Sequence, residues 1–394
     1  MKNEELENKD ILPTGWTKVQ WESITDIKNG KHYINVLNEN GKYPIYGSAG
    51  IINYADEYLC NEDTVIVGRK GTINKPLFVK EKFWNIDTAF GIESNHEVLN
   101  PLYLYYFCLN FDFMKLNQST AIPSLTKSNL QKIFMPLAPL NEQKRIVAKI
   151  EKLFSNLDNS DKYLLHLEKQ LKRYRQSVLK SAFEGEYKKI QWNEVTNIIN
   201  GKHYTDVVNE NGKYPIYGSA GIINYADEYL CNEDTVIVGR KGTINKPLFV
   251  KEKFWNIDTA FGIEANKERL APMYLYYFSL SFNFLELNQS TTIPSLTKSN
   301  LLKINMPLPD TLDEQQEIVN QIEKHFSIID KLETVVQQSI KESKRLRQSI
   351  LKQAFEGKLV EQDPNDESAS VLLEKIAKAK EEYLKAQKKQ VRKK

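Results

Sequence analysis

The sequence contains one long segment twice, and this repeat limits the fold more than any other feature. Residues 38–93 recur without a change as residues 209–264, a shift of 171 positions. Weaker matches extend the repeat in both directions, from 19–21 and 190–192 to 122–130 and 293–301. A period of this length is that of a whole domain and not of a solenoid repeat. The chain therefore carries two copies of one domain, which predicts two copies of one binding surface.

The composition is typical of a globular protein with two or three domains. Of the 394 residues, 41 % are hydrophobic and 11 % are aromatic, which is sufficient for real cores. Three cysteines are too few for a disulfide framework or a zinc site and indicate a reducing setting. The sequence shows neither a signal-like amino terminus nor a run of about 20 apolar residues, so we expect a cytoplasmic protein without a membrane function. The net charge of +3 does not by itself indicate a nucleic-acid partner.

Each copy is rich in short strand-forming runs that Gly, Asn and Asp separate. Residues 65–67 read as a buried strand, 75–79 as another, and 43–46 as a short edge strand before a turn. Residues 101–109 predict a helix with Pro101 near its first turn. The fold class we expect is α+β, with mixed α/β globular domains.

A different pattern follows each copy. From Asn141 to about Glu184 the sequence has neither Gly nor Pro, and apolar residues recur at heptad spacing. The predicted seam consists of Ile146, Ile150, Leu153, Leu157, Leu164, Leu167, Leu171, Tyr174 and Val178. After the second copy the pattern returns as Ile318, Ile322, Ile329, Leu332, Val336, Leu346 and Ile350, with polar breaks at His325, Ser339 and Ser343. Two such helices need each other to bury their stripes, so we expect an antiparallel coiled coil.

The predicted order is domain, long helix, near-identical domain, long helix. The expected segments are an N-terminal segment, domain 1, the first long helix, domain 2, the second long helix, and a C-terminal helix with a basic tail, over residues 1–15, 16–140, 141–185, 186–312, 313–360 and 361–394. An antiparallel helix pair relates the two halves by a pseudo-twofold axis, which is the symmetry of a DNA palindrome. The architecture thus favours one chain that does the work of a DNA-reading dimer.

Several motifs in this order resemble the specificity subunit of type I restriction-modification enzymes. They include residues 12–16, 47–51, 68–72 and 122–125, and above all residues 141–147, which recur in modified form as 313–319 at the start of the second long helix. Each motif alone is weak, but the full order occurs twice, and the resemblance spans essentially the whole chain.

The resemblance implies two target recognition domains and no catalysis by this chain. It implies that the partners are double-stranded DNA, two methyltransferase (modification) subunits docked along the helices, and motor-nuclease (restriction) subunits in a larger complex. No cofactor would bind this chain, because S-adenosylmethionine, ATP and magnesium would be used by the partner subunits. Family members usually carry two different recognition domains and read asymmetric split targets. Near-identical halves instead predict a bipartite, palindromic target.

The candidate DNA-binding residues lie in loops that both copies share. The turn after the predicted buried strand supplies arginine for guanine, and lysine and threonine for phosphates; the alternative is a turn with solvated charges. Its members are Arg69, Lys70 and Thr72, with Arg240, Lys241 and Thr243. A polar loop ahead of the first strand offers Lys31 and His32, with Lys202 and His203, where the histidine either contacts DNA or caps a turn.

Two further loops complete the candidate set. The segment at 46–50 combines small residues with an aromatic one, and it is either a DNA contact or a plain glycine turn; its candidates are Tyr46 and Ser48, with Tyr217 and Ser219. The segment at 117–120 offers amide and hydroxyl groups for adenine and phosphate, or hydrogen bonds within its own loop. Its candidates are Gln118 and Ser119, with Gln289 and Ser290.

Motifs for catalysis are missing from the sequence. No amino-methyltransferase motif, Gly-rich cofactor loop or phosphate-binding loop occurs. A nuclease site built on Asp63, Arg69 and Lys70 lacks a second acid, because Gly68 stands where that acid is needed. A duplicated nuclease and a protein scaffold without DNA remain as alternatives to the DNA-recognition hypothesis, and metal-dependent cutting or salt-insensitive binding would identify them.

Overall fold

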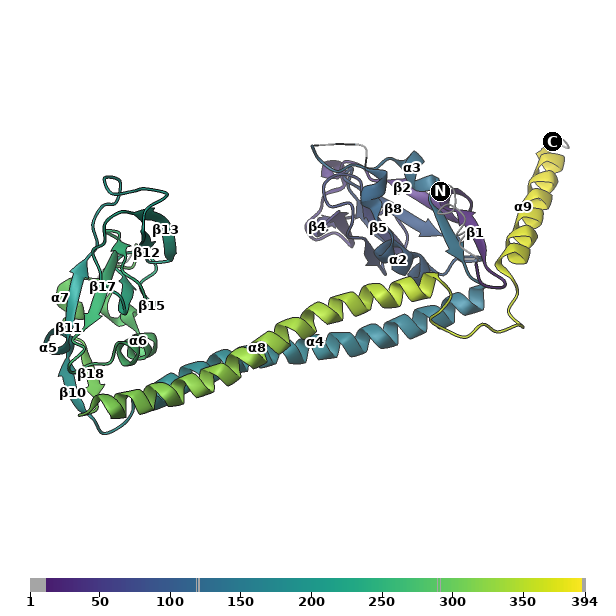
Figure 1. Cartoon of the computed structure of the whole chain (residues 1–394). Coiled ribbons are helices and arrows are strands. Elements are labelled where there is room, and N and C mark those ends of the chain that lie inside the picture. Colours follow the sequence, from purple (N-terminus) through teal and green to yellow (C-terminus); the bar gives the residue numbers. More distant parts are fainter. Residues whose placement is uncertain (1–11, 118, 120, 289, 291, 392–394) are drawn as a thin grey trace, which may run out of the picture. The chain divides into compact units, whose positions relative to one another are not determined.

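The computed structural model describes residues 12–117, 119, 121–288, 290 and 292–391, with the backbone alone for 380 and 383–391. It divides the chain into two compact units (Figure 1). Unit 1 contains residues up to 162 and from 340 onward, and unit 2 contains residues 163–339. Each unit therefore holds one globular domain together with a stretch of both long helices.

Domain 1 is built around a four-stranded antiparallel sheet. Its strand order is β2-β8-β5-β6, with β2 at Thr25–Asn29, β8 at Ala89–Ser94, β5 at Thr64–Gly68 and β6 at Leu77–Val79. All five residues of β5 are buried, as expected for an apolar central strand. Strand β5 confirms the strand predicted at 65–67, and β6 is shorter than the strand predicted at 75–79.

A second, three-stranded sheet has the order β4-β3-β7, over Gly50–Ala55, Tyr43–Gly47 and Trp84–Asn85. The prediction that residues 43–46 form an edge strand was wrong, because β3 lies in the middle of this sheet. Pro44 is tolerated there because β7 is only two residues long and pairs with Ile45 and Tyr46. The edge is β4 instead, where Ile51 and Ile52 are exposed.

Helix α2 (Pro101–Asn110) packs against β5, β6 and β8 and confirms the predicted helix (Figure 1). The side chain of Asn100 caps it by accepting from the amides of Leu102 and Tyr103. The remaining elements of domain 1 are β1 (Thr17–Gln20), which pairs with β9 (Phe134–Leu137), and α1 (Trp21–Ile24), η1 (Ile34–Val36), η2 (Phe113–Leu116) and α3 (Lys127–Gln131).

Domain 2 repeats this fold element by element, except that residues 205–207 form a turn where domain 1 has η1. Its four-stranded sheet has the order β11-β17-β14-β15 and its three-stranded sheet the order β13-β12-β16. Its elements are β10 (Lys188–Gln191), α5 (Trp192–Val195), β11 (Thr196–Asn200), β12 (Tyr214–Gly218), β13 (Gly221–Ala226), β14 (Thr235–Gly239), β15 (Leu248–Val250), β16 (Trp255–Asn256), β17 (Ala260–Ala265), α6 (Pro272–Ser281), η3 (Phe284–Leu287), α7 (Lys298–Leu301) and β18 (Asn305–Leu308).

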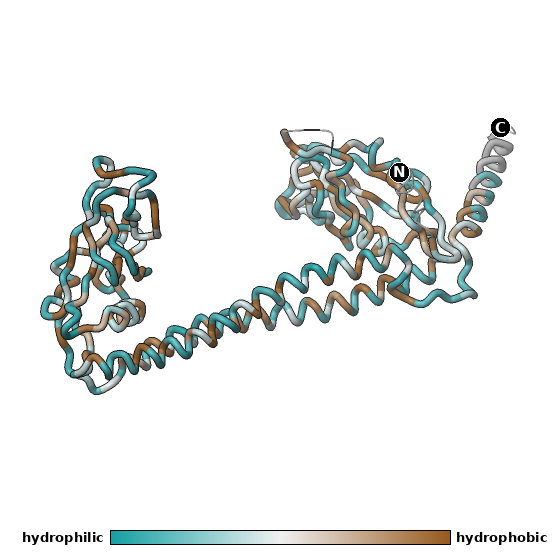
Figure 2. Tube along the Cα trace, viewed as in Figure 1, coloured by the Kyte–Doolittle hydropathy of each residue, from teal (hydrophilic) through white to brown (hydrophobic). Residues whose placement is uncertain are grey.

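The two long helices are α4 (Leu140–Ala182) and α8 (Leu312–Phe355). Hydrophobic and hydrophilic residues alternate along both of them (Figure 2). In unit 1, Arg347 of α8 pairs with Asp158 and Asp161 of α4 at 2.7 and 3.0 Å. In unit 2, Arg175 of α4 pairs with Asp330 and Glu333 of α8.

The helices pack antiparallel within each unit, as predicted, but the predicted seam was wrong in part. Leu332 and Leu346 are 47 % and 51 % exposed, and Tyr174 is 46 % exposed although its hydroxyl bonds His325 of α8 at 3.1 Å. The residues that follow them, among them Arg175 and Arg347, are less exposed and face the partner helix. A long arginine stem covers apolar surface while its charged end reaches a carboxylate, so arginine occupies a seam position that a count of apolar residues assigns to its neighbour.

The C-terminal helix α9 (Ala369–Val391) follows a loop and confirms the helix predicted in this region. The loop packs on the N-terminal segment of unit 1. The amide of Ala369 donates to the carbonyl of Gly15 at 2.9 Å, and the side-chain amide of Gln362 lies 3.3 Å from the carbonyl of Thr14.

Candidate functional site

In each domain one end of the four-stranded sheet is attached to a long helix, and we call it the helix end; the candidate loops gather at the opposite end of the sheet, which we call the recognition end. At the helix end of domain 1, the Gln143 side chain from the first turn of α4 is fully buried. Its Oε1 accepts from the amide of Asn100 at 2.8 Å, and its Nε2 donates to the carbonyls of Val98 and Ala138 at 2.9 and 2.8 Å. This glutamine fixes the domain to its helix.

The opposite end is organised around the turn at residues 85–89. Asn85 is fully buried, and its Nδ2 donates across the turn to the carbonyl of Ala89 at 3.1 Å. Its Oδ1 accepts from the thiol of Cys60 at 3.1 Å. Burial raises the pKa of Cys60 to about 12, so the thiol stays protonated and remains a donor. Asn85 thus holds the turn rigidly on the sheet.

The basic loop at 69–72 lies directly against this turn. The amide of Arg69 donates to the carbonyl of Thr88 at 2.7 Å, and its carbonyl accepts from Leu125 at 2.9 Å. The amide of Gly71 donates to the carbonyl of Pro123 at 2.9 Å. The loop backbone is therefore held on two sides, and the Arg69 guanidinium rests 5.9 Å from the centre of the Phe90 ring.

Two other candidate loops meet the same turn. The amides of Gly30 and Lys31 donate to the carbonyls of Ala89 and Asn85 at 3.1 and 3.0 Å. A side chain at Gly30 would lie 1.8 Å from the Ile86 carbonyl oxygen, so only glycine permits this approach. The Lys31 and His32 side chains are exposed, and the His32 ring stacks on Tyr33.

The 46–48 segment joins the turn through the Tyr46 carbonyl, which accepts from the Ile86 amide at 3.0 Å. The Tyr46 ring is half-buried and packs on Phe83 with 5.4 Å between ring centres. Its main contact is therefore inside the domain. Ser48, which follows it, is half-buried at the hairpin turn.

The described residues of the 117–125 segment complete the recognition end, which we define as the loops at 30–32, 46–48, 69–72 and 117–125, without residues 118 and 120, around the 85–89 turn. The Asn117 side chain serves its own loop, because its Oδ1 accepts from the amides of Ser119 and Ser124 at 3.1 and 2.9 Å. Ser124 in turn pairs with Lys70 in a β-bridge. Gln118 and Gln289 lie outside the described residues.

The recognition end of domain 2 has the same backbone bonds. The amide of Arg240 donates to the Thr259 carbonyl at 2.7 Å, and the Arg240 carbonyl accepts from the amide of Leu296 at 2.9 Å. The amide of Gly242 donates to the Pro294 carbonyl at 2.9 Å. The remaining candidates gather as in domain 1: Lys202, His203, Tyr217, Ser219, Lys241, Thr243 and Ser290. The structure thus brings together, in each domain, four loops that are far apart in the sequence.

The sequence prediction missed the residues that position these loops. Asn85 and Thr88 hold the recognition end, and Gln143 holds the helix end, although none was a candidate. A signal was present for Gln143, because the segments 141–147 and 313–319 both have Glu-Gln at the second and third positions. Gln315 makes the corresponding bonds in domain 2, to the amide of Ala271 and the carbonyl of Arg269.

No metal site or membrane helix emerges from the residues that the structure describes. Their His, Cys, Asp and Glu side chains form no group of three or more that could hold an ion. None of the described helices is both long and apolar enough to cross a membrane.

Comparison with known proteins assigns the domains. A family described as the type I restriction modification DNA specificity domain matches residues 13–169 and again 184–342. The chain is 24 % identical to the type I restriction enzyme EcoBI specificity subunit of Escherichia coli, over 92 % of this chain and 91 % of that protein. It is 25 % identical to the MjaVIII specificity subunit of Methanocaldococcus jannaschii, over 88 % and 94 % of the two chains.

Solved structures share the fold. One is a chain from a structural study of complex assembly and conformational transition in the type I R-M system, with a TM-score of 0.76 and 20 % identity over 88 % of this chain and 99 % of that one. Another is the HsdS subunit from Thermoanaerobacter tengcongensis, with a TM-score of 0.60 and 20 % identity over 88 % and 98 % of the two chains. The two matches to the domain family cover more than half of the sequence, so the chain belongs to the type I restriction modification DNA specificity family.

Proposed function

We propose that this chain is the specificity subunit of a type I restriction-modification complex and reads a bipartite, palindromic DNA target. Each recognition end would contact one half-site, with the arginine of the basic loop on a base edge and the lysine and threonine on phosphates. The observation that carries the proposal is the repetition of the recognition end. Arg69 and Arg240 are held by the same backbone bonds, at 2.7 and 2.9 Å, in basic loops that have the same sequence in the two domains.

The inverted symmetry of the target is supported by the ion pairs between the long helices. In unit 1 the arginine belongs to α8 and the acids to α4, whereas in unit 2 the arginine belongs to α4 and the acids to α8. Each helix thus takes in one unit the role that its partner takes in the other. This exchange of roles is characteristic of an isologous contact, which twofold symmetry produces.

The chain would have no catalytic activity and would dock two methyltransferase subunits along α4 and α8, with motor-nuclease subunits joining a larger complex. Exposed apolar side chains on these helices support the docking role. Leu165 and Val335 are 50 % and 60 % exposed. S-adenosylmethionine, ATP and magnesium would then belong to the partner subunits.

Single-molecule methylation sequencing of the native genome, with and without the gene, tests this function. The expected result is adenine methylation at a split inverted-repeat motif that disappears with the gene. An asymmetric motif would overturn the palindrome but keep the family function. Binding of the motif should fall equally in the Arg69→Ala and Arg240→Ala chains, and strongly unequal losses would contradict equivalent half-sites.

A further inference from the structure

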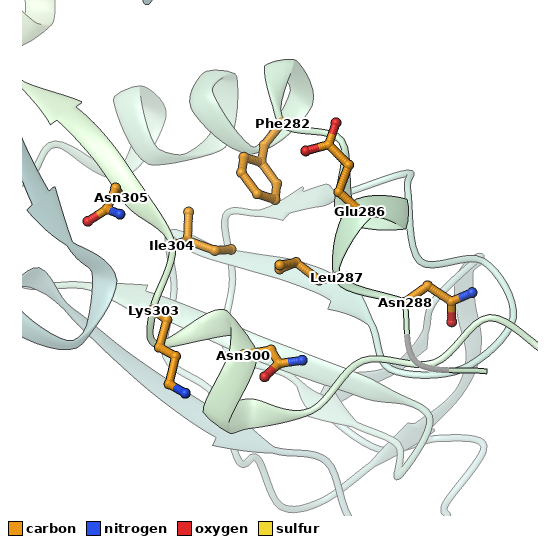
Figure 3. Close-up of a pocket in the computed structure, with 8 residues that line it drawn as sticks. All are labelled: Phe282, Glu286, Leu287, Asn288, Asn300, Lys303, Ile304 and Asn305. Carbon is orange, nitrogen blue, oxygen red and sulfur yellow. The ribbon is translucent and has the colours of Figure 1, made fainter.

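A cleft opens beside the recognition end of each domain, between the η2 or η3 turn and the short helix that follows it. In domain 2 its volume is about 490 Å³ (Figure 3). In domain 1 the corresponding cleft has about 420 Å³. Asn117 and Asn288 line the two clefts and also hold the loop that pairs with the basic loop. The clefts therefore adjoin the surface that would face DNA.

The two clefts differ in charge although the recognition loops do not. Lys115 and Lys132 both line the cleft of domain 1. In domain 2 the corresponding positions are Glu286 and Lys303, which Figure 3 shows on opposite sides of the cleft, with Leu287 and Ile304 between them. All four charged side chains are exposed. Among the residues that the structure describes, neither Lys115 nor Lys132 forms an ion pair with an acidic side chain.

Two neighbouring positions also differ in charge. Asn35 follows the His32 loop in domain 1, where domain 2 has Asp206. Against this, Asp112 of domain 1 corresponds to Asn283. Glu286 in place of Lys115 makes domain 2 more negative by two charges, and Asp206 in place of Asn35 makes it more negative by one. Asn283 in place of Asp112 makes it less negative by one. The surroundings of the recognition end are therefore two charges more negative in domain 2.

We propose that the cleft of domain 1 binds a DNA phosphate beside the half-site, through Lys115 and Lys132, and that Glu286 prevents the same contact in domain 2. This inference rests on the proposed function. A phosphodiester fits the site because two exposed lysines without acidic partners line the cleft, together with the amide side chain of Asn129. The two domains would then read the same half-site sequence but hold the DNA backbone with different strength.

Salt dependence of binding by the full chain measures this difference directly. The slope of log K against log salt is negative, and each lost phosphate contact on duplex DNA reduces its magnitude by about 0.9. With the palindromic target, Lys115→Glu should make the slope shallower by about that amount, and Glu286→Lys should make it steeper by about the same amount. The chain with both substitutions has the wild-type net charge and should recover the wild-type slope.

Lys149→Glu is the matched control, because it makes the same charge change on the exposed surface of α4. It should leave the slope unchanged. Equal slopes for wild type, Lys115→Glu and Glu286→Lys would overturn the phosphate site. A slope that follows net charge alone, and changes equally with Lys149→Glu, would overturn it as well. Failure of the wild-type chain to prefer the target over scrambled DNA would instead contradict the proposed function.

Discussion

The guanidinium of Arg347 lies 5.2 Å from the centre of the Phe154 ring and bonds Asp158 and Asp161 beyond it. In unit 2 the Arg175 guanidinium lies 4.4 Å from the centre of the Phe326 ring and bonds Asp330 and Glu333. Each arginine therefore lies between the two helices, where its guanidinium packs over an aromatic ring of the partner helix and forms ion pairs with two carboxylates of that same helix.

Replacing Arg347 by leucine should destabilise unit 1. The substitution keeps apolar contact with Phe154 but leaves two carboxylates close together, and we expect a loss of about 1–2 kcal/mol, because the pairs are partly exposed. Urea unfolding at low and high salt measures it, and the loss should shrink as salt screens the carboxylates. Lys172→Ala, which breaks an exposed pair with Glu168, is the control and should change stability less. An Arg347→Leu effect no larger than the control would contradict this role.

Glu142 should give the stability of unit 1 a specific pH dependence. Its side chain is 1 % exposed, and its Oε1 has no hydrogen-bond partner. Burial is the main cause that raises the pKa of Glu142 above its ordinary value near 4.5, although Trp16 and Arg145 lower it in part. The folded chain thus binds this proton more tightly than the unfolded chain. The stability that it contributes is complete below the ordinary pKa and is lost as pH rises through the folded-state value.

Glu142→Gln should therefore raise the melting temperature at pH 7 and have little effect near pH 4. Thermal unfolding across this range measures the difference. The matched control is Glu314→Gln, at the corresponding position of α8, where the side chain is exposed. A Glu142→Gln chain that is less stable than wild type at pH 7 would show that the carboxylate is favourable in its charged form.

Gln143→Leu should weaken the attachment of domain 1 to α4. The change leaves one amide and two carbonyls buried without partners, and we expect a cost of about 2–4 kcal/mol. Gln315→Leu should have a similar effect on unit 2, somewhat smaller because its bond to the Pro309 carbonyl is longer, at 3.5 Å. Chemical unfolding of the full chain checks both, and a loss under about 0.5 kcal/mol would fall within the range of an ordinary surface substitution.

Asn85→Ala should weaken binding of the proposed DNA target although the Asn85 side chain is fully buried. Without its side chain the 85–89 turn loses its bond across to Ala89, and the amides of Lys31 and Arg69, which depend on this turn, should exchange with solvent faster. Hydrogen exchange of these amides and binding of the target would be measured together. Asn256→Ala should have the same effect in domain 2. Weaker binding with unchanged exchange would mean that the turn does not act by holding the loops.

The sequence predicted the duplication, strands β5 and β6, helix α2 and the long antiparallel helices, because each follows from a local period or a repeat; strands β2 and β8 of the same sheet were not predicted. It did not predict that β3 lies inside its sheet, since Pro44 indicates an edge strand unless the short length of β7 is known. The candidate residues were chosen one loop at a time. Their meeting at one turn depends on Asn85, a buried amide that a sequence pattern does not distinguish from a loop residue.

DNA contact by the candidate residues stays a prediction, and the structure shows which of their side chains are exposed and which are engaged within the domain. The Tyr46 ring and the Asn117 amide have partners within the domain, whereas Lys31, His32 and Lys70 are exposed. The exposed side chains are therefore better candidates for DNA contact than the aromatic and amide groups. Sequence patterns could not separate the two sets because they give residue type without burial.

The glutamine at the helix end bonds only main-chain atoms of the domain that it holds. The three positions that it contacts in domain 1 are Val98, Asn100 and Ala138, and in domain 2 they are Arg269, Ala271 and Pro309. The side chains differ, yet the attachment is kept. Because the glutamine needs only backbone amides and carbonyls, a domain of quite different sequence can be joined to the same helix and keep the same hydrogen bonds. The domains can therefore be exchanged by recombination while the helices stay unchanged.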